Sequence, residues 1–196
     1  MTFYHRNLPH WHPVGASIFL TWRLHGSLPS SKRSTGRIAC ATKPLTAQVS
    51  PGRRFKQLDS ILDKTRKGPF WLKDPRIAAI VVNAIHHGEI TLGFYDLHAY
   101  AVMPNHVHLL ITPHVPIRRL TKGLKGTSSQ VANSILHRKG NLFWQDESFD
   151  HWIRTSTEFD RIRTYIEFNP VSAGLVTRPQ DWPWSSAHLS TNASKG

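Results

Sequence analysis

The strongest constraint on the fold is a pair of apolar segments separated by the turn sequence Met103-Pro-Asn105. The first segment begins at about Tyr95 and is rich in aromatic and β-branched residues. The second runs from His106 to Ile111 and is almost entirely apolar. Segments of this length and composition favour β-strands. Because only a short turn joins them, the two strands must pair as antiparallel neighbours.

The second of these segments begins with the pattern His106-Val-His108. Side chains alternate between the two faces of a strand, so the two imidazoles should lie side by side while Val107 points into the opposite layer. Two neighbouring imidazoles on a rigid strand supply half of a metal site. The alternative is structural, because most His-x-His pairs in strands bind nothing.

Periodicity predicts several further elements. A first strand covers residues 17–23, and extended segments cover 142–145 and 149–154. Apolar residues at helical spacing predict a short helix around residues 55–62 and a longer one over 117–138, with Leu120, Leu124, Val131 and Ile135 forming its buried stripe.

Capping signals predict two more helices. Asp74 is a candidate N-cap followed by Pro75, and Gly88 is expected to end that helix. Thr155 or Ser156 should cap a last helix over about 158–168, which Asn169-Pro170 should stop. This order of elements indicates an α+β fold. The simplest candidate is a ferredoxin-like antiparallel sheet with helices packed mainly on one face.

The chain is expected to divide into three parts. Residues 1–16 are rich in His, Pro and Trp and are predicted to form an extended N-terminal arm. Residues 17–176 carry the periodic elements and form the domain, with a basic loop at about 30–54. Residues 177–196 are predicted to form an irregular C-terminal tail.

The charge of the chain favours a polyanionic partner. Lysine and arginine number 25 against 12 acidic residues, which gives a net charge of +13. Such a field attracts nucleic acid first and an anionic membrane surface second. No long amphipathic helix with a Trp/Leu face and no long apolar run supports a membrane. One cysteine, Cys40, excludes an internal disulfide framework or a cysteine-rich zinc site and is compatible with a cytoplasmic location.

The last predicted helix carries Tyr165 and Asn169, which share a face because they are four residues apart. A tyrosine that attacks phosphorus needs a cation close by, because the pKa of a free phenol is about 10. A divalent ion held by His106, His108 and the Asn169 side-chain oxygen would meet that need. The ordinary alternative is that Tyr165 only fills the core or the surface.

Several of these segments together resemble a known family. The resemblance is carried by residues 103–111 (MPNHVHLLI), 143–145 (FWQ), 149–154 (FDHWIR) and 165–176 (YIEFNPVSAGLV). The opening stretches 8–11 (LPHW) and 19–29 (FLTWRLHGSLP) also match. The chain thus resembles the IS200-like single-tyrosine transposases, which are HUH endonucleases. The resemblance is closest to their REP-associated tyrosine transposase branch and covers nearly the whole chain outside residues 30–54.

The resemblance implies a ferredoxin-like sheet with the histidine pair on a central strand. It implies that His106 and His108 are metal ligands, that Asn169 is the third ligand, and that Tyr165 is the nucleophile. The cofactor is Mg²⁺ or Mn²⁺, with no small-molecule cofactor. The implied reaction is attack on single-stranded DNA, leaving a 5′-phosphotyrosine and a free 3′-hydroxyl, in DNA transposition or in the processing of REP-like hairpins.

The expected partner is single-stranded or hairpin DNA, with no membrane, in the cytoplasm and associated with the nucleoid. A monomer is favoured and a dimer is possible. The expected phosphate contacts are Arg53, Arg54, Arg118, Arg119, Lys122, Lys125, Arg161 and Arg163. Trp22, Trp144, Trp152 and Tyr95 are candidates for stacking on bases. Two histidines and an amide offer the metal no carboxylate, so metal binding is expected to be weak without DNA phosphate.

Two functions other than that of an enzyme remain open. The first is a catalytically lapsed protein that still recognises a DNA hairpin. The second is a basic RNA-binding domain in which the histidine pair is structural. A nuclease assay on single-stranded DNA and RNA, with and without Mn²⁺, distinguishes them.

Overall fold

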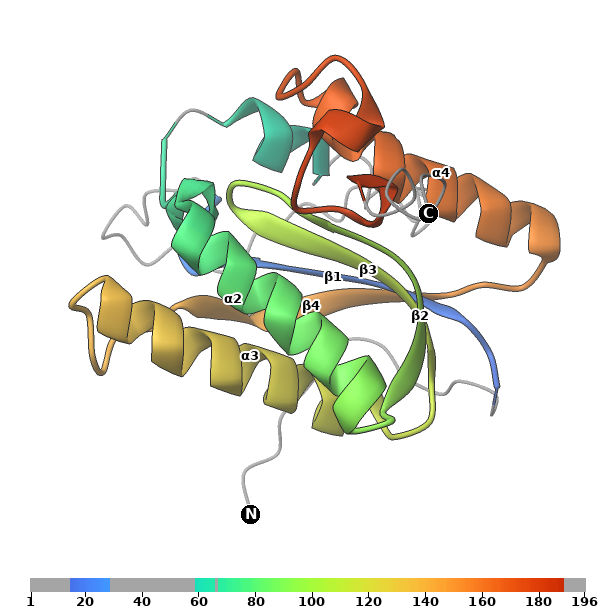
Figure 1. The fold of residues 1–196 in the computed structure, drawn as a ribbon, viewed down its shortest axis with the longest axis horizontal. Helices are drawn as coiled ribbons and strands as arrows, with labels where there is room; N and C mark the ends of the chain where they lie inside the picture. The colour runs from blue at the N-terminus through green and yellow to red at the C-terminus, as the bar shows by residue number, and fades with distance from the viewer. Residues whose placement is uncertain (1–14, 29–58, 66, 189–196) are drawn as a thin grey trace, which may run out of the picture.

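The computed structural model describes residues 15–28, 59–65 and 67–188. Its centre is a four-stranded sheet with the order β2-β3-β1-β4 (Figure 1). The strands are β1 (Ile18–Leu24), β2 (Tyr95–Val102), β3 (His106–Pro113) and β4 (Trp144–Trp152). All neighbouring strands are antiparallel. This is the predicted ferredoxin-like order, with the histidine pair on central strand β3.

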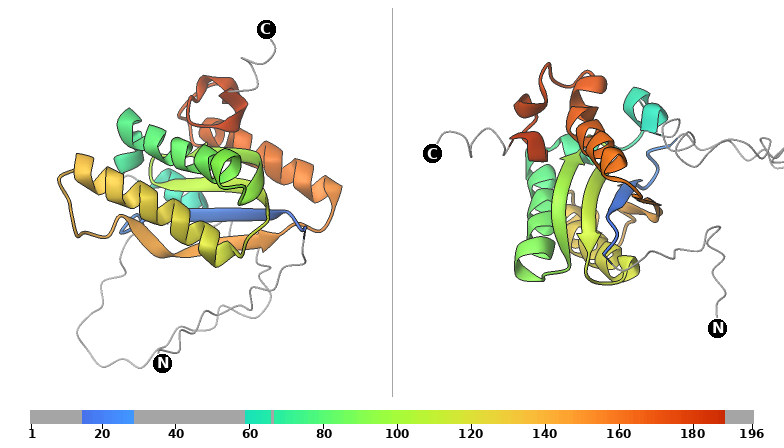
Figure 2. Two further views of the ribbon diagram at one scale, coloured as in Figure 1. Left: turned by 60° about the horizontal axis from the view of Figure 1, so that its bottom comes forward. Right: turned by 90° about the vertical axis from the view of Figure 1, so that its right-hand side faces the viewer.

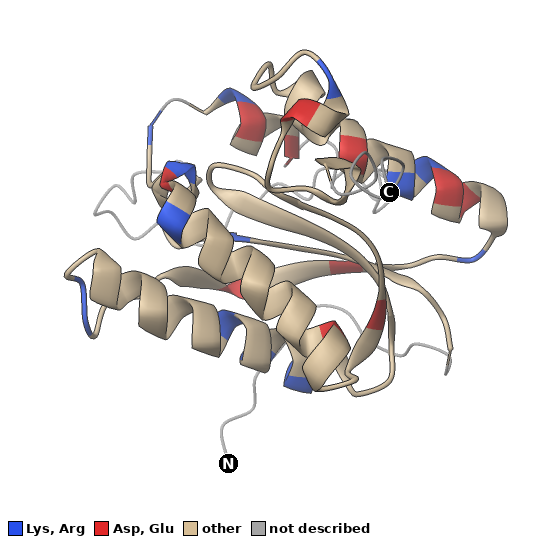
Figure 3. Cartoon of the chain, viewed as in Figure 1, with Lys and Arg blue, Asp and Glu red and all other residues tan. Residues whose placement is uncertain are grey.

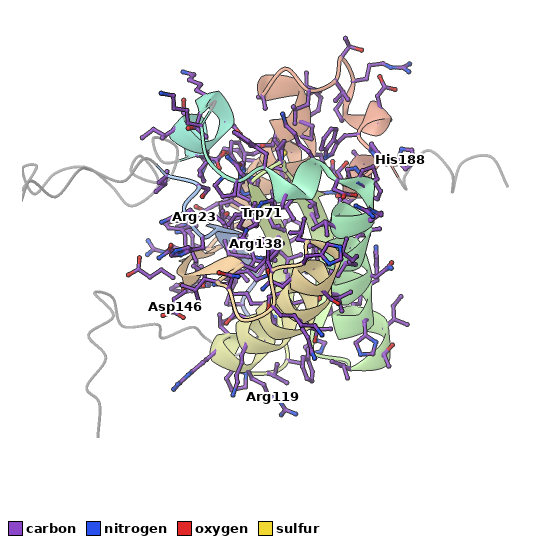
Figure 4. All side chains as sticks on the ribbon, turned by 90° about the vertical axis from the view of Figure 1, so that its left-hand side faces the viewer. Arg23, Trp71, Arg119, Arg138, Asp146 and His188 are labelled. Atoms are coloured by element: carbon purple, nitrogen blue, oxygen red, sulfur yellow. The ribbon has the colours of Figure 1, made fainter. Side chains whose placement is uncertain are left out.

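Helices α2 (Pro75–His86) and α3 (Ile117–Ile135) cover one face of the sheet (Figure 2). Their apolar side chains pack on Leu20, Val107 and Leu109 and form the larger core cluster. Arg138, just after α3, places its guanidinium 3.8 Å from the centre of the Trp71 ring, a contact that lies within this helical layer (Figure 4). The predicted α+β sheet with helices is confirmed, but the helices do not lie mainly on one face, because a further long helix packs on the opposite face.

Helix α4 (Ser156–Ser172) crosses the opposite face, where it packs on Phe19, Ala99 and Leu110. Residues 59–64, which are also helical, lie beside α4 on this side (Figure 2). Phe55 and Leu58, predicted to belong to this short helix, lie outside the described residues. α4 and residues 59–64 therefore cover part of this face of the sheet. The polar side chains that β3 presents on this face lie between the sheet and α4.

Local signals predicted some helix ends correctly and others wrongly. Asp74 caps α2 as expected, accepting a hydrogen bond from the Arg76 N–H. Gly88 does not end the helical path, which continues as a π-helical turn over His87–Thr91. A Cβ at Gly88 would lie 2.5 Å from the Tyr95 hydroxyl oxygen, so glycine is needed here for close packing rather than as a stop.

Two further predictions need correction. Helix α4 runs through Pro170 to Ser172 instead of stopping at Asn169, with Pro170 itself buried. In α3 the predicted buried residue Val131 is 43% exposed, and the neighbouring Ala132 is fully buried in its place. The two short extended segments predicted at 142–154 form the single strand β4.

The residues after α4 close the outer edge of β2. The Trp184 carbonyl accepts from the Val102 N–H at 2.8 Å, and the Trp182 indole donates to the Val102 carbonyl at 3.0 Å. Ala101 and Ser185 form an isolated antiparallel bridge. Residues 177–188 therefore pack along this edge, with a 3₁₀ turn at Pro179–Asp181 and helical residues at 186–188. Within the described ranges, no helix combines the length and apolar character that crossing a bilayer requires.

Candidate metal centre and tyrosine

Strand β3 places two imidazoles next to each other on the face covered by α4. His106 and His108 are 1% and 0% exposed, and their Nε2 atoms lie 3.0 Å apart. Val107 between them points into the core formed with α2 and α3. The alternation predicted for this strand is therefore observed, and both rings are withdrawn from solvent.

Hydrogen bonds at the far side of each ring orient the imidazoles. His106 Nδ1 lies 2.7 Å from the Asn105 side-chain oxygen, while the Asn105 amide nitrogen donates to the Leu62 carbonyl. Because an amide oxygen only accepts, His106 Nδ1 must carry the proton, which leaves the lone pair of Nε2 directed at His108. His108 Nδ1 lies 2.8 Å from the Thr21 hydroxyl. Such outer contacts fix imidazole ligands in metal sites.

A buried carboxylate, Asp59, faces both rings. Its Oδ1 lies 3.4 Å from His106 Nε2 and 3.2 Å from His108 Nε2, and Asp59 is 2% exposed. These three side chains form a group whose ligand atoms lie within 4.8 Å of one another, a spacing that suits a metal ion. The expectation that no carboxylate would be available is therefore wrong. Asp59 and Asp63 are four residues apart on one helix face, and this spacing was the signal in the sequence.

Tyr165 and Asn169 meet the same carboxylate from α4. The Tyr165 hydroxyl donates to Asp59 Oδ2, and the Asn169 amide donates to that oxygen at 3.2 Å. Tyr165 is half-buried, and its ring lies edge-on to the His108 ring at 5.9 Å between centroids. The four residues singled out from the sequence as His pair, tyrosine and asparagine are thus brought together around Asp59.

Three oxygens in this cluster are buried without a hydrogen-bond partner among the described residues. They are Asp59 Oδ1, Asp63 Oδ1 and Asn169 Oδ1. Buried oxygens are almost always satisfied in folded proteins, so a group of three marks a place where a further partner, such as a cation, would fit. Two imidazole nitrogens together with carboxylate and amide oxygens suit a divalent ion such as Mn²⁺ or Mg²⁺. The donor set therefore fits the expected metal.

The electrostatics of the cluster favour a neutral His106 and an ionised Asp59. Burial, reinforced by neighbouring His108, lowers the pKa of His106 to about 3. Burial alone would raise the pKa of Asp59, but the facing histidines and the Asn169 amide outweigh it and hold this pKa below its usual value. Burial, together with the charge of Asp59, raises the pKa of Asp63 to about 7.

The cations predicted to contact DNA lie on two separate surfaces (Figure 3). Arg118, Lys122 and Lys125 line a groove of about 760 Å³ between α3 and the start of β4, on the far side of the sheet from Tyr165. Lys125 already donates to the Gln145 and Asp146 carbonyls, at 3.0 and 2.9 Å. Arg119 lies over the Phe94 ring.

The remaining predicted cations belong to α4 or lie outside the description. Arg161 and Arg163 on α4 are exposed and lie near Glu158 and Glu167. Arg53 and Arg54 lie outside the described residues. Of the aromatic residues proposed to stack on bases, Trp22, Trp144 and Tyr95 are buried in the core, so that prediction is wrong for them. Trp152 is half-buried and carries the Arg154 guanidinium over its ring.

Residues 74–169 match the model of the family described as "Transposase IS200 like". The chain belongs to the IS200-like transposase family. The matched segment contains both histidines, Tyr165 and Asn169, and it ends at Asn169. Asp59 lies before the matched segment, so the family model does not cover it. No curated protein matches the chain.

Two solved structures resemble this member of the family. One is a REP-associated tyrosine transposase bound to a REP hairpin. It is 17% identical, with a TM-score of 0.56, and the match covers 96% of this chain and 84% of that one. This likeness supports the fold. The other is a proposed transposase from Deinococcus radiodurans, 19% identical, with a TM-score of 0.36 and coverage of 86% and 98%. That score is too low to support an argument.

Proposed function

We propose that this IS200-like transposase is a metal-dependent single-stranded DNA endonuclease and strand transferase that uses Tyr165 as its nucleophile. The observation that carries the proposal is the double role of Asp59. One carboxylate oxygen faces both histidine Nε2 atoms, and the other accepts the Tyr165 hydroxyl hydrogen bond. A nucleophile and a metal-binding group connected through a single side chain form a compact site for phosphoryl transfer.

The residues that would hold the ion are His106, His108, Asp59 and Asn169, with Mg²⁺ or Mn²⁺ as the metal. When bound, such an ion polarises a non-bridging phosphate oxygen and neutralises developing charge. The lone pair of His106 Nε2 is available because Asn105 fixes the proton on Nδ1. The partnerless oxygens of Asp59 and Asn169 complete the donor set.

Tyr165 is oriented for attack by its hydrogen bond to Asp59. The phenol oxygen forms a bond to a DNA phosphorus, and the bond between that phosphorus and the 3′ oxygen breaks. The phenol proton passes along the hydrogen bond to Asp59, and the 3′ oxygen takes a proton from solvent. The products are a 5′-phosphotyrosine and a free 3′-hydroxyl. Attack by a 3′-hydroxyl on the phosphotyrosine reverses the step and joins strands without an external energy source.

The proposed substrate is single-stranded or hairpin DNA of the REP type, encountered in the cytoplasm. A net charge of +13 attracts a polyanion, and exposed cations on α3 and α4 offer phosphate contacts. The similar solved transposase is bound to a REP hairpin. We further propose that the chain belongs to the REP-associated branch and acts as a monomer, because α4 packs on the sheet of its own chain and the segment after α4 covers the outer edge of β2.

The test uses REP-like hairpin oligonucleotides with single-stranded flanks, incubated with the protein and Mn²⁺. We expect the wild-type protein to form a covalent protein–DNA band that survives denaturation. Tyr165→Phe should abolish the band while leaving DNA binding within about twofold, because only the attacking oxygen is lost. Tyr100→Phe is the matched control, since its hydroxyl contacts His86 on the other face.

The same assay separates the competing functions. Binding without any adduct in the wild-type protein would indicate a lapsed hairpin-binding protein and would refute the enzymatic proposal. A preference for RNA oligonucleotides, unaffected by Mn²⁺, would indicate the RNA-binding alternative. An adduct that persists in Tyr165→Phe would show that another residue is the nucleophile.

A further inference from the structure

A small cavity adjoins the histidine cluster on the side of the β2–β3 turn. It has a volume of about 210 Å³ and is lined by residues from four segments that are distant in the sequence. These include Asp63 from the helical residues 59–64, Phe70 and Lys73 before α2, Met103 and Asn105 in the turn, and Leu175 after α4. We propose that this cavity receives one unpaired base of the DNA strand, next to the phosphodiester that Tyr165 attacks. This inference rests on the proposed function.

The cavity and the histidines share their dividing wall. Asp63 lines the cavity, and its Oδ1 lies 3.9 Å from His106 Nε2. Asn105 also lines the cavity, and its side-chain oxygen contacts His106 Nδ1. A single layer of side chains therefore separates the cavity from His106. A strand whose phosphate lies at the histidines has an adjacent nucleotide within reach of the cavity.

The size of the cavity selects a single base. At ~30 Å³ for each water in the liquid, 210 Å³ corresponds to about seven waters. That volume is comparable to one nucleobase and too small for a base pair. An unpaired base can be turned out of a single strand into such a cavity at low cost.

The walls suit a flat aromatic ring carried by a phosphate backbone. The half-buried Leu175 contributes apolar surface, and the half-buried Phe70 offers a ring for stacking. The exposed Lys73 ammonium lies 5.0 Å from the centre of the Phe70 ring, at the rim. A base stacked on Phe70 would bring its phosphate close to this cation.

The experiment places 2-aminopurine at successive positions of a REP-like oligonucleotide bound to the Tyr165→Phe protein. Fluorescence of this base analogue changes when it stacks on an aromatic ring. We expect one position beside the cleaved phosphate to respond more strongly than its neighbours, and Phe70→Ala to remove that response. An abasic residue at that position should weaken binding by roughly 5- to 150-fold, which corresponds to the 1–3 kcal/mol typical of base stacking.

Phe94→Ala is the matched control, because Phe94 is also half-buried and also carries a cation, Arg119, 5.0 Å from the centre of its ring. This variant should keep the response. Phe70→Trp preserves an aromatic ring and should retain the fluorescence response. Its response would show that the response lost in Phe70→Ala depends on the aromatic ring. Free deoxynucleotides should not compete at concentrations that saturate the oligonucleotide, because they lack the flanking phosphates.

The result has separate consequences for the two proposals. A covalent adduct in the wild-type protein without any position-dependent fluorescence response would overturn the base cavity and leave the nuclease intact. A response that Phe70→Ala does not alter would overturn it too. A Phe70-dependent response without any adduct would support the cavity and refute the nuclease.

Discussion

Replacing Asp59 by asparagine removes one negative charge and keeps the shape of the side chain. An asparagine oxygen can still accept from Tyr165 and Asn169, so local packing should persist. What is lost is the carboxylate that lies 3.2 and 3.4 Å from the two histidine Nε2 atoms. We therefore expect Asp59→Asn to weaken Mn²⁺ binding specifically. The effect can be measured through the stability that the metal confers on the folded protein.

The expected size follows from binding linkage. Mn²⁺ at 100 times its Kd stabilises the folded state by about 2.7 kcal/mol. For a chain of this length, that corresponds to a rise in Tm of about 5–11 °C. Removing a residue that only orients a metal ligand typically lowers metal affinity about 10- to 100-fold. Removing a direct ligand should lower it at least as much. At the same Mn²⁺ concentration the stabilisation should then fall to about 1.4 kcal/mol or less.

The assay is thermal unfolding of each protein with a chelator and with a series of Mn²⁺ concentrations. Asp160→Asn is the matched control, because Asp160 is an exposed carboxylate on α4. It should show the wild-type response to Mn²⁺. An equal rise in Tm for wild type, Asp160→Asn and Asp59→Asn would show that Asp59 is not a ligand. Equal Tm values in chelator would show that packing is preserved.

Two further results are expected. With chelator present, the free energy of unfolding should fall as the pH drops below about 6.5, by on the order of 1 kcal/mol per pH unit, because the folded-state pKa of His106 is about 3 and the unfolded chain binds the proton more readily. Acid titration followed by circular dichroism should show a weaker dependence of stability on pH for His106→Gln. The same dependence in this variant and in the wild-type protein would show that His106 is not responsible. Gly88→Ala should lower the free energy of unfolding, measured by chemical denaturation, by about 1–3 kcal/mol because its Cβ meets the Tyr95 hydroxyl. Adding Tyr95→Phe to this variant should recover part of that loss. If the losses of the two substitutions simply add, the contact is not responsible.

The elements with local signals could be predicted from the sequence. The β2–β3 pair follows from two apolar segments and a turn, and α2 begins at Asp74-Pro75 because that dipeptide satisfies the helix end. The shared face of Tyr165 and Asn169 follows from helical spacing. These features depend on contacts within a few residues, which a sequence displays directly.

The features that failed depend on tertiary contacts. Asp59 reaches the histidines because the helical residues 59–64 pack beside the β2–β3 turn, where the Asn105 amide donates to the Leu62 carbonyl. Helix α4 continues past Pro170 because both Asn169 and Pro170 are buried. The Ala173 N–H donates to the Asn169 carbonyl, and the Leu175 N–H donates to the Pro170 carbonyl. The spacing of Asp59 and Asp63 marks an acidic helix face, but no local pattern specifies what that face or the Pro170 region packs against.

The candidate site is also where this fold gives up stability. Of the five buried side-chain atoms without a hydrogen-bond partner among the described residues, three are oxygens of Asp59, Asp63 and Asn169. Each such atom costs about 1–3 kcal/mol, which random packing defects would distribute over the core. These three oxygens gather around the two imidazoles, where one bound cation would satisfy all of them at once. The same oxygens that weaken the metal-free protein would then define where the metal binds, and this makes metal-dependent stability a direct measure of the site.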